Sequence, residues 1–270
     1  MLTFLFGLKA FGCSCNYDIT EFSPYRLIDY KNIFECKPIS VKTTGNKFFY
    51  TVVISKTYWG DRHDTVQIST YQEHSMCGYT LELNETYLIY AYGADNLEIN
   101  ICGPSRQLTG VKESFLDTGE PTDSLTTTIN GVYKKYSFSD IKDFSRKANE
   151  NEINYLDLIS KTSTGGLLTK FTNGKTSGEI NIVDKKLNGS SVFYYPNGKL
   201  KATGSLKNNS KEGTWAIYRF MNYYGPTLYY YSTGKYMNNE MRGKWKGKII
   251  LGTKKEYESY YLGSLDLDYK

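Results

Sequence analysis

The chain has 270 residues, of which 40% are apolar and 16% aromatic, proportions typical of a globular protein with a sizeable core. The formal net charge of +5 is spread along the sequence without a run of like charges, which excludes the concentrated basic footprint of a nucleic-acid-binding protein. Tyrosine is unusually frequent, with 26 residues, and it favours sheets that are buried on one side and wet on the other. We therefore expect a mainly β protein.

Residues 1–12 are apolar and end in Ala10-Phe11-Gly12, with small residues at the third and first positions before Cys13. This pattern predicts the tail of a secretory signal peptide that is cleaved between Gly12 and Cys13. A lipoprotein signal is the alternative, although Ala-Phe-Gly-Cys is a poor version of that motif. The segment is shorter than the ~20 apolar residues of a membrane span. The rest of the chain contains no other candidate membrane segment. We expect a secreted, periplasmic or cell-surface protein without a transmembrane segment.

Four of the five cysteines lie in three places, at Cys13-Ser14-Cys15, Cys77 and Cys102. A bond between Cys13 and Cys15 would be strained, so two pairings remain open, and each binds the start of the chain to the segments around 77 and 102. Each bridge would contribute about 4 kcal/mol by restricting the unfolded chain. The fifth cysteine, Cys36, has no evident partner and is predicted to be a buried free thiol, with a reactive thiol as the alternative. Disulfides of this kind fit an oxidising compartment.

The first half of the chain is predicted to form a small barrel. A modest helical pattern covers 19–29, and candidate strands rich in Val, Ile, Phe and Tyr follow at 33–41, 47–55, 65–69, 86–92 and 97–101. Thr43-Thr44-Gly45-Asn46 is the clearest hairpin turn. Five strands of this size suit a five-stranded barrel of the OB type.

The cysteine spacing, together with Asn32-Ile33-Phe34-Glu35, Trp59-Gly60 and Tyr87-Leu88-Ile89-Tyr90-Ala91, resembles the netrin-like family over residues 13–110. This is the OB-fold module of the tissue inhibitors of metalloproteinases. The resemblance implies that Cys13 bonds Cys77 and that Cys15 bonds Cys102.

The same resemblance implies a protease-binding ridge. In the family, the amine and carbonyl of the first cysteine chelate the catalytic zinc of a metallopeptidase, which displaces the attacking water. Here those roles would fall to Cys13, with Ser14 entering the specificity pocket and Ser75 and Met76 held alongside. Two features depart from the family: Asn16-Tyr17 replaces its apolar and proline continuation, and the cysteine-rich second subdomain of the animal inhibitors is missing.

Catalytic motifs are not evident. Asp61-Arg62-His63-Asp64 offers one imidazole in a charged loop, where a zinc site needs several converging ligands. The sequence has no nucleophile elbow and no glycine loop that would hold a phosphate. We therefore expect no enzyme activity, no cofactor and no metal.

Residues 111–164 are predicted to be a linker and a short helix. The stretch from 103 to 128 is polar, with 118–124 the best linker candidate. Within 152–159, Ile153, Leu156 and Ile159 recur at three-residue steps, which indicates a short amphipathic helix.

The last part of the chain, 165–270, is repetitive. The motif aromatic-x-x-Gly-Lys begins at Phe171, Tyr195 and Tyr231, which puts its glycine at Gly174, Gly198 and Gly234. A second alignment matches 204–215 with 234–245 and ends at Trp215 and Trp245.

Each unit is predicted to place a positive-φ turn at Asn-Gly or Thr-Gly between two aromatic strands, and the resulting hairpins must stack to bury their faces. The pattern resembles MORN-type repeats over residues 165–250, which implies a C-terminal sheet of stacked hairpins. The alternative to a binding role is that the repeat aromatics only form the ladder of that stack.

Taken together, these features predict two β domains, an N-terminal OB-type barrel and a C-terminal sheet of MORN-like hairpins, joined by a helical connector. The expected function is non-enzymatic binding of a protein or other macromolecule of the extracellular space or cell envelope. The first alternative is a metalloendopeptidase inhibitor acting through Cys13-Ser14-Cys15 on a catalytic zinc. A hydrolase with an unrecognised site is the second.

Overall fold

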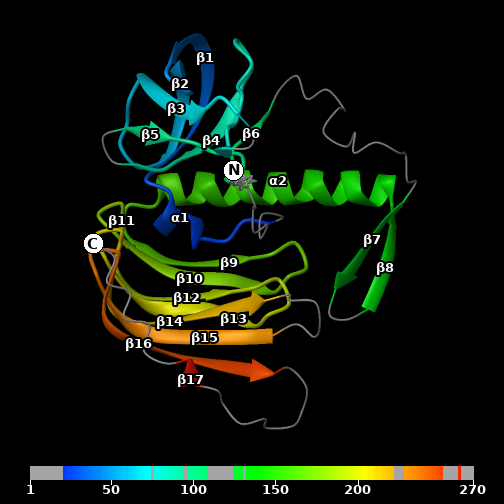
Figure 1. Ribbon diagram of the computed structural model, residues 1–270, viewed down its shortest axis with the longest axis vertical. Coiled ribbons are helices and arrows are strands. Elements are labelled where there is room, and N and C mark those ends of the chain that lie inside the picture. Colours follow the sequence, from blue (N-terminus) through cyan, green and yellow to red (C-terminus); the bar gives the residue numbers. More distant parts are fainter. Residues whose placement is uncertain are drawn as a thin grey trace, which may run out of the picture. The chain divides into compact units, whose positions relative to one another are not determined.

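The computed structural model describes residues 21–73, 76–93, 96–108, 124–129, 132–221, 228–251 and 261–262. It is mainly β, with two helices and two large sheets among these residues (Figure 1). The chain divides into two compact units: residues 30–108 belong to the first, and residues 21–29 and 124–262 to the second. The expected mainly β fold is confirmed.

The first unit is a six-stranded sheet in the order β5-β3-β2-β1-β4-β6. Its strands are β1 (Asn32–Thr44), β2 (Lys47–Trp59), β3 (Thr65–Tyr71), β4 (Tyr87–Ala91), β5 (Leu97–Glu98) and β6 (Arg106–Gln107). Five of them match the predicted strands, with ends shifted by a few residues. Neighbours are antiparallel except β3 and β5, which are parallel.

This sheet curves around one hydrophobic core. The inward side chains alternate along each strand, as the two-residue period of a strand requires. Buried members include Phe34 and Cys36 of β1, Tyr50 and Val52 of β2, and Ile68 of β3.

The described strand path ends at β5 and β6 and is not a closed barrel. One bridge nevertheless connects Tyr92, just after β4, with Glu98 of β5. It is made by two backbone hydrogen bonds of 3.0 and 2.9 Å. The predicted hairpin turn is also present, because Gly45 has φ +57° in the two-residue loop that joins β1 and β2.

The second unit contains a nine-stranded antiparallel sheet in the order β11-β10-β12-β13-β14-β15-β16-β17, with β9 also paired to β10. Figure 1 shows β10 and β12 to β16 following one another across the sheet. The strands are β9 (Gly165–Lys170), β10 (Thr176–Val183), β11 (Lys186–Leu187), β12 (Gly189–Tyr194), β13 (Leu200–Lys207), β14 (Ser210–Met221), β15 (Leu228–Met237), β16 (Glu240–Leu251) and β17 (Tyr261–Leu262). A separate hairpin consists of β7 (Ser124–Ile129) and β8 (Val132–Ser137).

Three hairpins of this sheet share one turn geometry. Both central residues have positive φ at Asp184-Lys185, Asn208-Asn209 and Asn238-Asn239, as type I′ turns require. The turns are also hydrogen-bonded to one another in a repeated pattern. The Asn209 side chain accepts a bond from Leu187 N, and Asn239 does the same for Lys211 N, both at 2.6 Å.

The glycine motifs divide into two kinds. Gly174 and Gly198 have φ of +81° and +85° and lie in turns with the same backbone hydrogen bonds, so these two predicted turns are confirmed. The predicted third turn at Gly234 is wrong, because this residue lies inside β15. Glycine is required at this position for another reason, because a Cβ on residue 234 would be 2.3 Å from the ring of Trp245. Gly204 makes room for Trp215 in the same way, since a Cβ on residue 204 would be 2.3 Å from the indole ring.

Residues 21–29, which precede the first sheet in the chain, pack on the second one and form what we call the strap. The strap ends in the short helix α1 (Arg26–Asp29). Phe22 is fully buried and stacks on Tyr155, and Pro24 fills the space beside Gly178, where a Cβ would be 2.5 Å away. The helical pattern predicted for 19–29 is thus confirmed only for α1, and residues 19 and 20 lie outside the described part.

The connector helix α2 (Phe138–Lys161) has 24 residues and is much longer than the short helix that was predicted. Its buried face includes Ala148, Glu152, Leu156 and Ile159, whereas Ile153 is only half-buried. Of the three apolar residues predicted for the buried face, Leu156 and Ile159 are buried. The first half of α2 has apolar residues at helical spacing, at Phe138, Ile141, Phe144 and Ala148, so the sequence contained a signal for the earlier helix start that the prediction did not use.

Candidate binding groove

An open groove of about 770 Å³ lies on the outer surface of the first unit. Its lining comes from four separate parts of the chain: Asn32 of β1, Lys47 and Phe49 of β2, the 61–69 stretch around β3, and 96–98 at β5. The sheet register places Lys47 opposite Tyr71, and Phe49 opposite Ser69. The groove therefore follows β3 from the β2–β3 loop toward the start of β2.

The loop at the far end of the groove is held by Asn32. Its side-chain oxygen accepts a 3.1 Å hydrogen bond from the backbone N–H of Asp61. Gly60 has φ +91°, and a Cβ there would be 2.3 Å from the same oxygen, so the turn requires glycine. This geometry leaves Asp61 and His63 exposed along the groove.

The near end of the groove is closed by an ion pair. The Lys47 ammonium is 3.1 Å from the Glu98 carboxylate, and both side chains are about three-quarters buried. The ammonium also lies 4.6 Å from the centre of the Tyr71 ring. Because the charge of Lys47 is matched by Glu98, the groove carries no excess of positive charge.

The floor between these ends is formed by outward side chains of β2 and β3. Phe49 is half-buried and lies opposite the small Ser69, whose hydroxyl donates a 3.5 Å bond to the Leu97 carbonyl. Gln67 is exposed on the same strand, and Asn96 is exposed beside β5. The lining thus combines the Phe49 ring with two amides and with the apolar side chains of Val66 and Leu97.

Of the predicted protease-binding ridge, Cys13, Ser14, Cys15 and Ser75 lie outside the described residues, as does the predicted signal segment 1–12. Met76 is half-buried, and its sulfur accepts a 3.7 Å hydrogen bond from the Asn46 amide. Cys77 and Cys102 both take part in disulfides, and the two segments are adjacent because Ile101 N donates a 3.0 Å bond to Cys77 O. The expected pairings with Cys13 and Cys15 stay predictions.

Cys36 is a free thiol with 0% exposure, as predicted. Burial raises the pKa of this thiol to about 12, so the thiolate is disfavoured. Burial is also the main cause that raises the pKa of Tyr79 to about 12. Both side chains belong to the core and offer no reactive group.

On the second unit, the predicted aromatic positions belong to a buried row. Tyr25 of the strap contacts Phe193 edge-on at 5.0 Å, Phe193 stacks on Trp215 at 6.5 Å, and Tyr236 lies edge-on to both Trp215 and Trp245. Tyr195, in contrast, uses its hydroxyl to bond the Tyr218 carbonyl at 2.7 Å.

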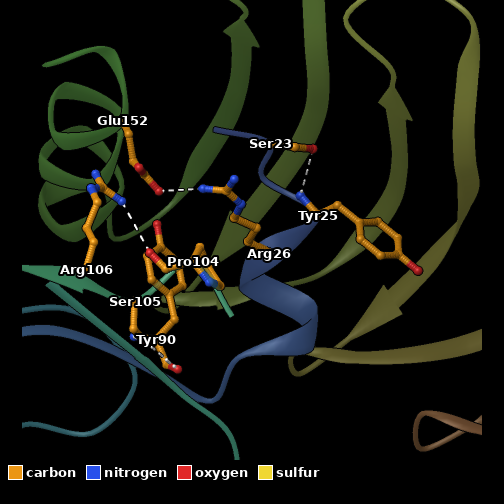
Figure 2. Close-up of polar contacts among 8 residues, drawn as sticks. All are labelled: Ser23, Tyr25, Arg26, Tyr90, Pro104, Ser105, Arg106 and Glu152. Atoms are coloured by element: carbon orange, nitrogen blue, oxygen red, sulfur yellow. Dashed lines mark hydrogen bonds and ion pairs between the residues drawn. The ribbon is translucent and has the colours of Figure 1, made fainter. Parts of the chain in front are cut away.

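A lysine beside this row is also satisfied by the chain itself. Lys211 is 9% exposed, with its ammonium 4.9 Å from the Tyr25 ring and 3.7 Å from the Asp29 carboxylate. At the start of α1, Arg26 pairs with Glu152 of α2 at 2.6 Å (Figure 2). These contacts explain how the strap is held on the second unit.

Among the residues that the structure describes, no group of three or more His, Cys, Asp or Glu side chains could hold a metal ion. In the same part of the chain, no helix has the length and apolarity needed to cross a membrane. Sequence reasoning singled out His63 only as a poor metal ligand and missed the groove, because its lining is discontinuous in the chain.

Comparison with known proteins finds no family model and no curated protein that matches this chain.

Proposed function

We propose that the protein is a non-enzymatic binding protein that recognises a macromolecule of the extracellular space or cell envelope. The observation that carries this proposal is the open groove of about 770 Å³ along β3. It has the size of a ligand site, ~300–1,000 Å³, and combines one aromatic ring with several convergent polar groups. The groove is open to solvent along β3, so part of a longer chain can lie in it.

The proposed architecture supports this function. We propose that the first unit is an OB-type barrel of the netrin-like kind, since its strands pair in the order expected of a partly open five-stranded barrel, with the Tyr92–Glu98 bridge between β4 and β5. For the second unit we propose MORN-like repeats. The equivalent turns at Asn208-Asn209 and Asn238-Asn239 and the two glycine–tryptophan pairs support that assignment.

The test is co-sedimentation of the mature protein with four insoluble materials: peptidoglycan, chitin, cellulose and fibrillar collagen. The expected result is saturable binding to at least one of them, resistant to 0.15 M salt, because a groove without excess charge gains little from ionic attraction. If the protein stays in the supernatant with all four, the proposed function is wrong.

A second candidate is the inhibition of a zinc endopeptidase by the Cys13-Ser14-Cys15 ridge. The observation that favours it is that Cys77 and Cys102 are both disulfide-bonded and lie on adjacent segments. Bridges from these positions to Cys13 and Cys15 would hold the ridge beside Met76. Its test is the assay described in the Discussion.

A further inference from the structure

We propose that the groove along β3 binds a neutral, hydroxyl-rich saccharide chain. This inference rests on the proposed binding function and names the ligand chemistry of that same site. Three properties of the groove carry it: the sign of its charge, the kind of polar groups it presents, and the position of its one aromatic ring.

Charge excludes polyanions. The only lysine of the lining, Lys47, is 3.1 Å from Glu98, so the two charges cancel. Asp61 remains as a carboxylate on the exposed loop. His63 adds an exposed imidazole beside it. A nucleic acid, a sulfated polysaccharide or an anionic lipid would therefore meet the Asp61 carboxylate, and the one lysine of the lining is already paired with Glu98. Phosphate and sulfate recognition depends on lysine and arginine, so these ligand classes are disfavoured.

The polar groups match hydroxyls. Gln67 and Asn96 each carry an amide with both donors and acceptors, and Asp61 adds acceptor oxygens. A sugar hydroxyl donates one hydrogen bond and accepts others, so it satisfies such a mixed set. Purely apolar ligands would leave these groups without partners, at a cost of about 1–3 kcal/mol for each group that becomes buried.

The aromatic ring fits a sugar face. Phe49 is half-buried, lies opposite the small Ser69 in the sheet register, and lines the groove. The face of an aromatic ring carries negative charge density, and the C–H bonds on one side of a pyranose are weakly positive. A sugar unit stacked on Phe49 would place its hydroxyls toward the Gln67 and Asn96 amides, which lie in the same groove.

The test adds soluble competitors and groove variants to the co-sedimentation assay. Chitohexaose, cellohexaose and maltohexaose are the neutral probes, and a heparin hexasaccharide is the anionic one. We expect at least one neutral probe to release the protein from its insoluble material, and heparin not to do so. Phe49→Ala and Asn96→Ala should each weaken binding by about tenfold. Val53→Ala, an exposed side chain of β2 that is outside the groove lining, should leave binding unchanged.

Other outcomes separate this inference from the proposed function. Binding to collagen alone would mean that the protein binds a protein ligand, and release by heparin alone would mean a polyanion ligand. Either result overturns the saccharide inference and leaves the binding function standing. Equal binding by Phe49→Ala, Asn96→Ala and the unmodified protein would also overturn it. Circular dichroism of each variant shows whether a loss of binding is a loss of folding, and Asn96, exposed beside β5, provides a variant that leaves the core intact.

Discussion

The glycine–tryptophan pairs of the second sheet give the sharpest stability prediction. A Cβ at Gly204 would lie 2.3 Å from Trp215, where ordinary contacts are 3.4–4 Å. The indole is completely buried and is flanked by Phe193 and Tyr236, so it has no free space to move into. Gly204→Ala should therefore destabilise the second unit by about 3 kcal/mol, the upper end of the cost of overpacking. For a domain of this size the melting temperature should fall by roughly 6–12 °C.

The hairpin of β10 and β12 suggests how to test whether the clash with Trp215 causes the loss of stability. The register that pairs Glu179 with Val192 brings Ile180 opposite Ser191, and both are buried. Ile180 corresponds to Gly204, and Ser191 corresponds to Trp215, when the two hairpins are aligned on their turns. The large side chain is therefore on the first strand in one hairpin and on the second strand in the other. The double variant Gly204→Ile/Trp215→Ser should thus be more stable than the sum of its single variants predicts, by about 1–3 kcal/mol.

The assay is thermal and urea unfolding of the full chain, followed by tryptophan fluorescence and circular dichroism. Gly213→Asn is the matched control, because Gly213 has φ +68° with nothing within 4 Å of its Cβ position, and asparagine tolerates that conformation. It should cost less than about 1 kcal/mol. Additive effects of the two substitutions in the double variant, or a Gly204→Ala variant as stable as the control, would refute the argument.

Three further predictions concern pH, the strap and the inhibitor alternative. Stability of the first unit should fall as the pH rises from about 9 to about 12, because Cys36 and Tyr79 lose their protons near 9.0 and 10.0 when unfolded but only near 12 when folded. Urea unfolding at pH 8, 10 and 11 measures this. Arg26→Met should destabilise the second unit by about 2–3 kcal/mol, since it removes a charge-assisted hydrogen bond to Glu152, a carboxylate with 5% exposure. One extra alanine before Cys13 should abolish any inhibition of zinc endopeptidases, because an acylated amine cannot chelate the metal.

Each of these has a control. For the pH series, Cys36→Ala removes the thiol part of the alkaline loss, and a stability that stays constant up to pH 11 would contradict the assignment. For the strap, Arg242→Ala breaks an ion pair that is more than half exposed and should cost at most about 1 kcal/mol. If Arg242→Ala lowers the free energy of unfolding as much as Arg26→Met does, the burial of an ion pair does not determine its contribution to stability. Inhibition by the extended protein as strong as by the mature one would rule out chelation by Cys13.

Much of the first sheet could be predicted from local pattern, because alternating apolar residues such as Tyr50, Val52 and Ile54 record which side of a strand is buried. The strap could not. Residues 21–29 have a local helical pattern, but nothing within them indicates that they pack on a sheet formed more than a hundred residues later. Only the contacts of Phe22, Pro24 and Tyr25 reveal it.

The error at Gly234 has a similar origin. Thr-Gly-Lys at 233–235 looks like the Asn-Gly-Lys turns at Gly174 and Gly198, yet glycine serves two different needs in this protein. At Gly174 it allows a positive φ, and at Gly234 it makes room for Trp245. The sequence distance to the next tryptophan was the available signal, because Gly204 and Trp215 have the same separation as Gly234 and Trp245.

The groove was beyond prediction because Asn32, Phe49, Gln67 and Asn96 meet only after the sheet has curved. None of these residues belongs to a motif, and each alone would be interpreted as an ordinary surface side chain.

The most direct test of the saccharide groove is an NMR titration of the isotope-labelled mature protein with an equimolar mixture of chitohexaose, cellohexaose and maltohexaose. We predict that backbone amide shifts concentrate at Lys47, Phe49, 65–69 and 96–98, with the Phe49→Ala variant showing weaker and smaller changes. Amide shifts confined to the second sheet, or none at millimolar concentration of the mixture, would contradict the account.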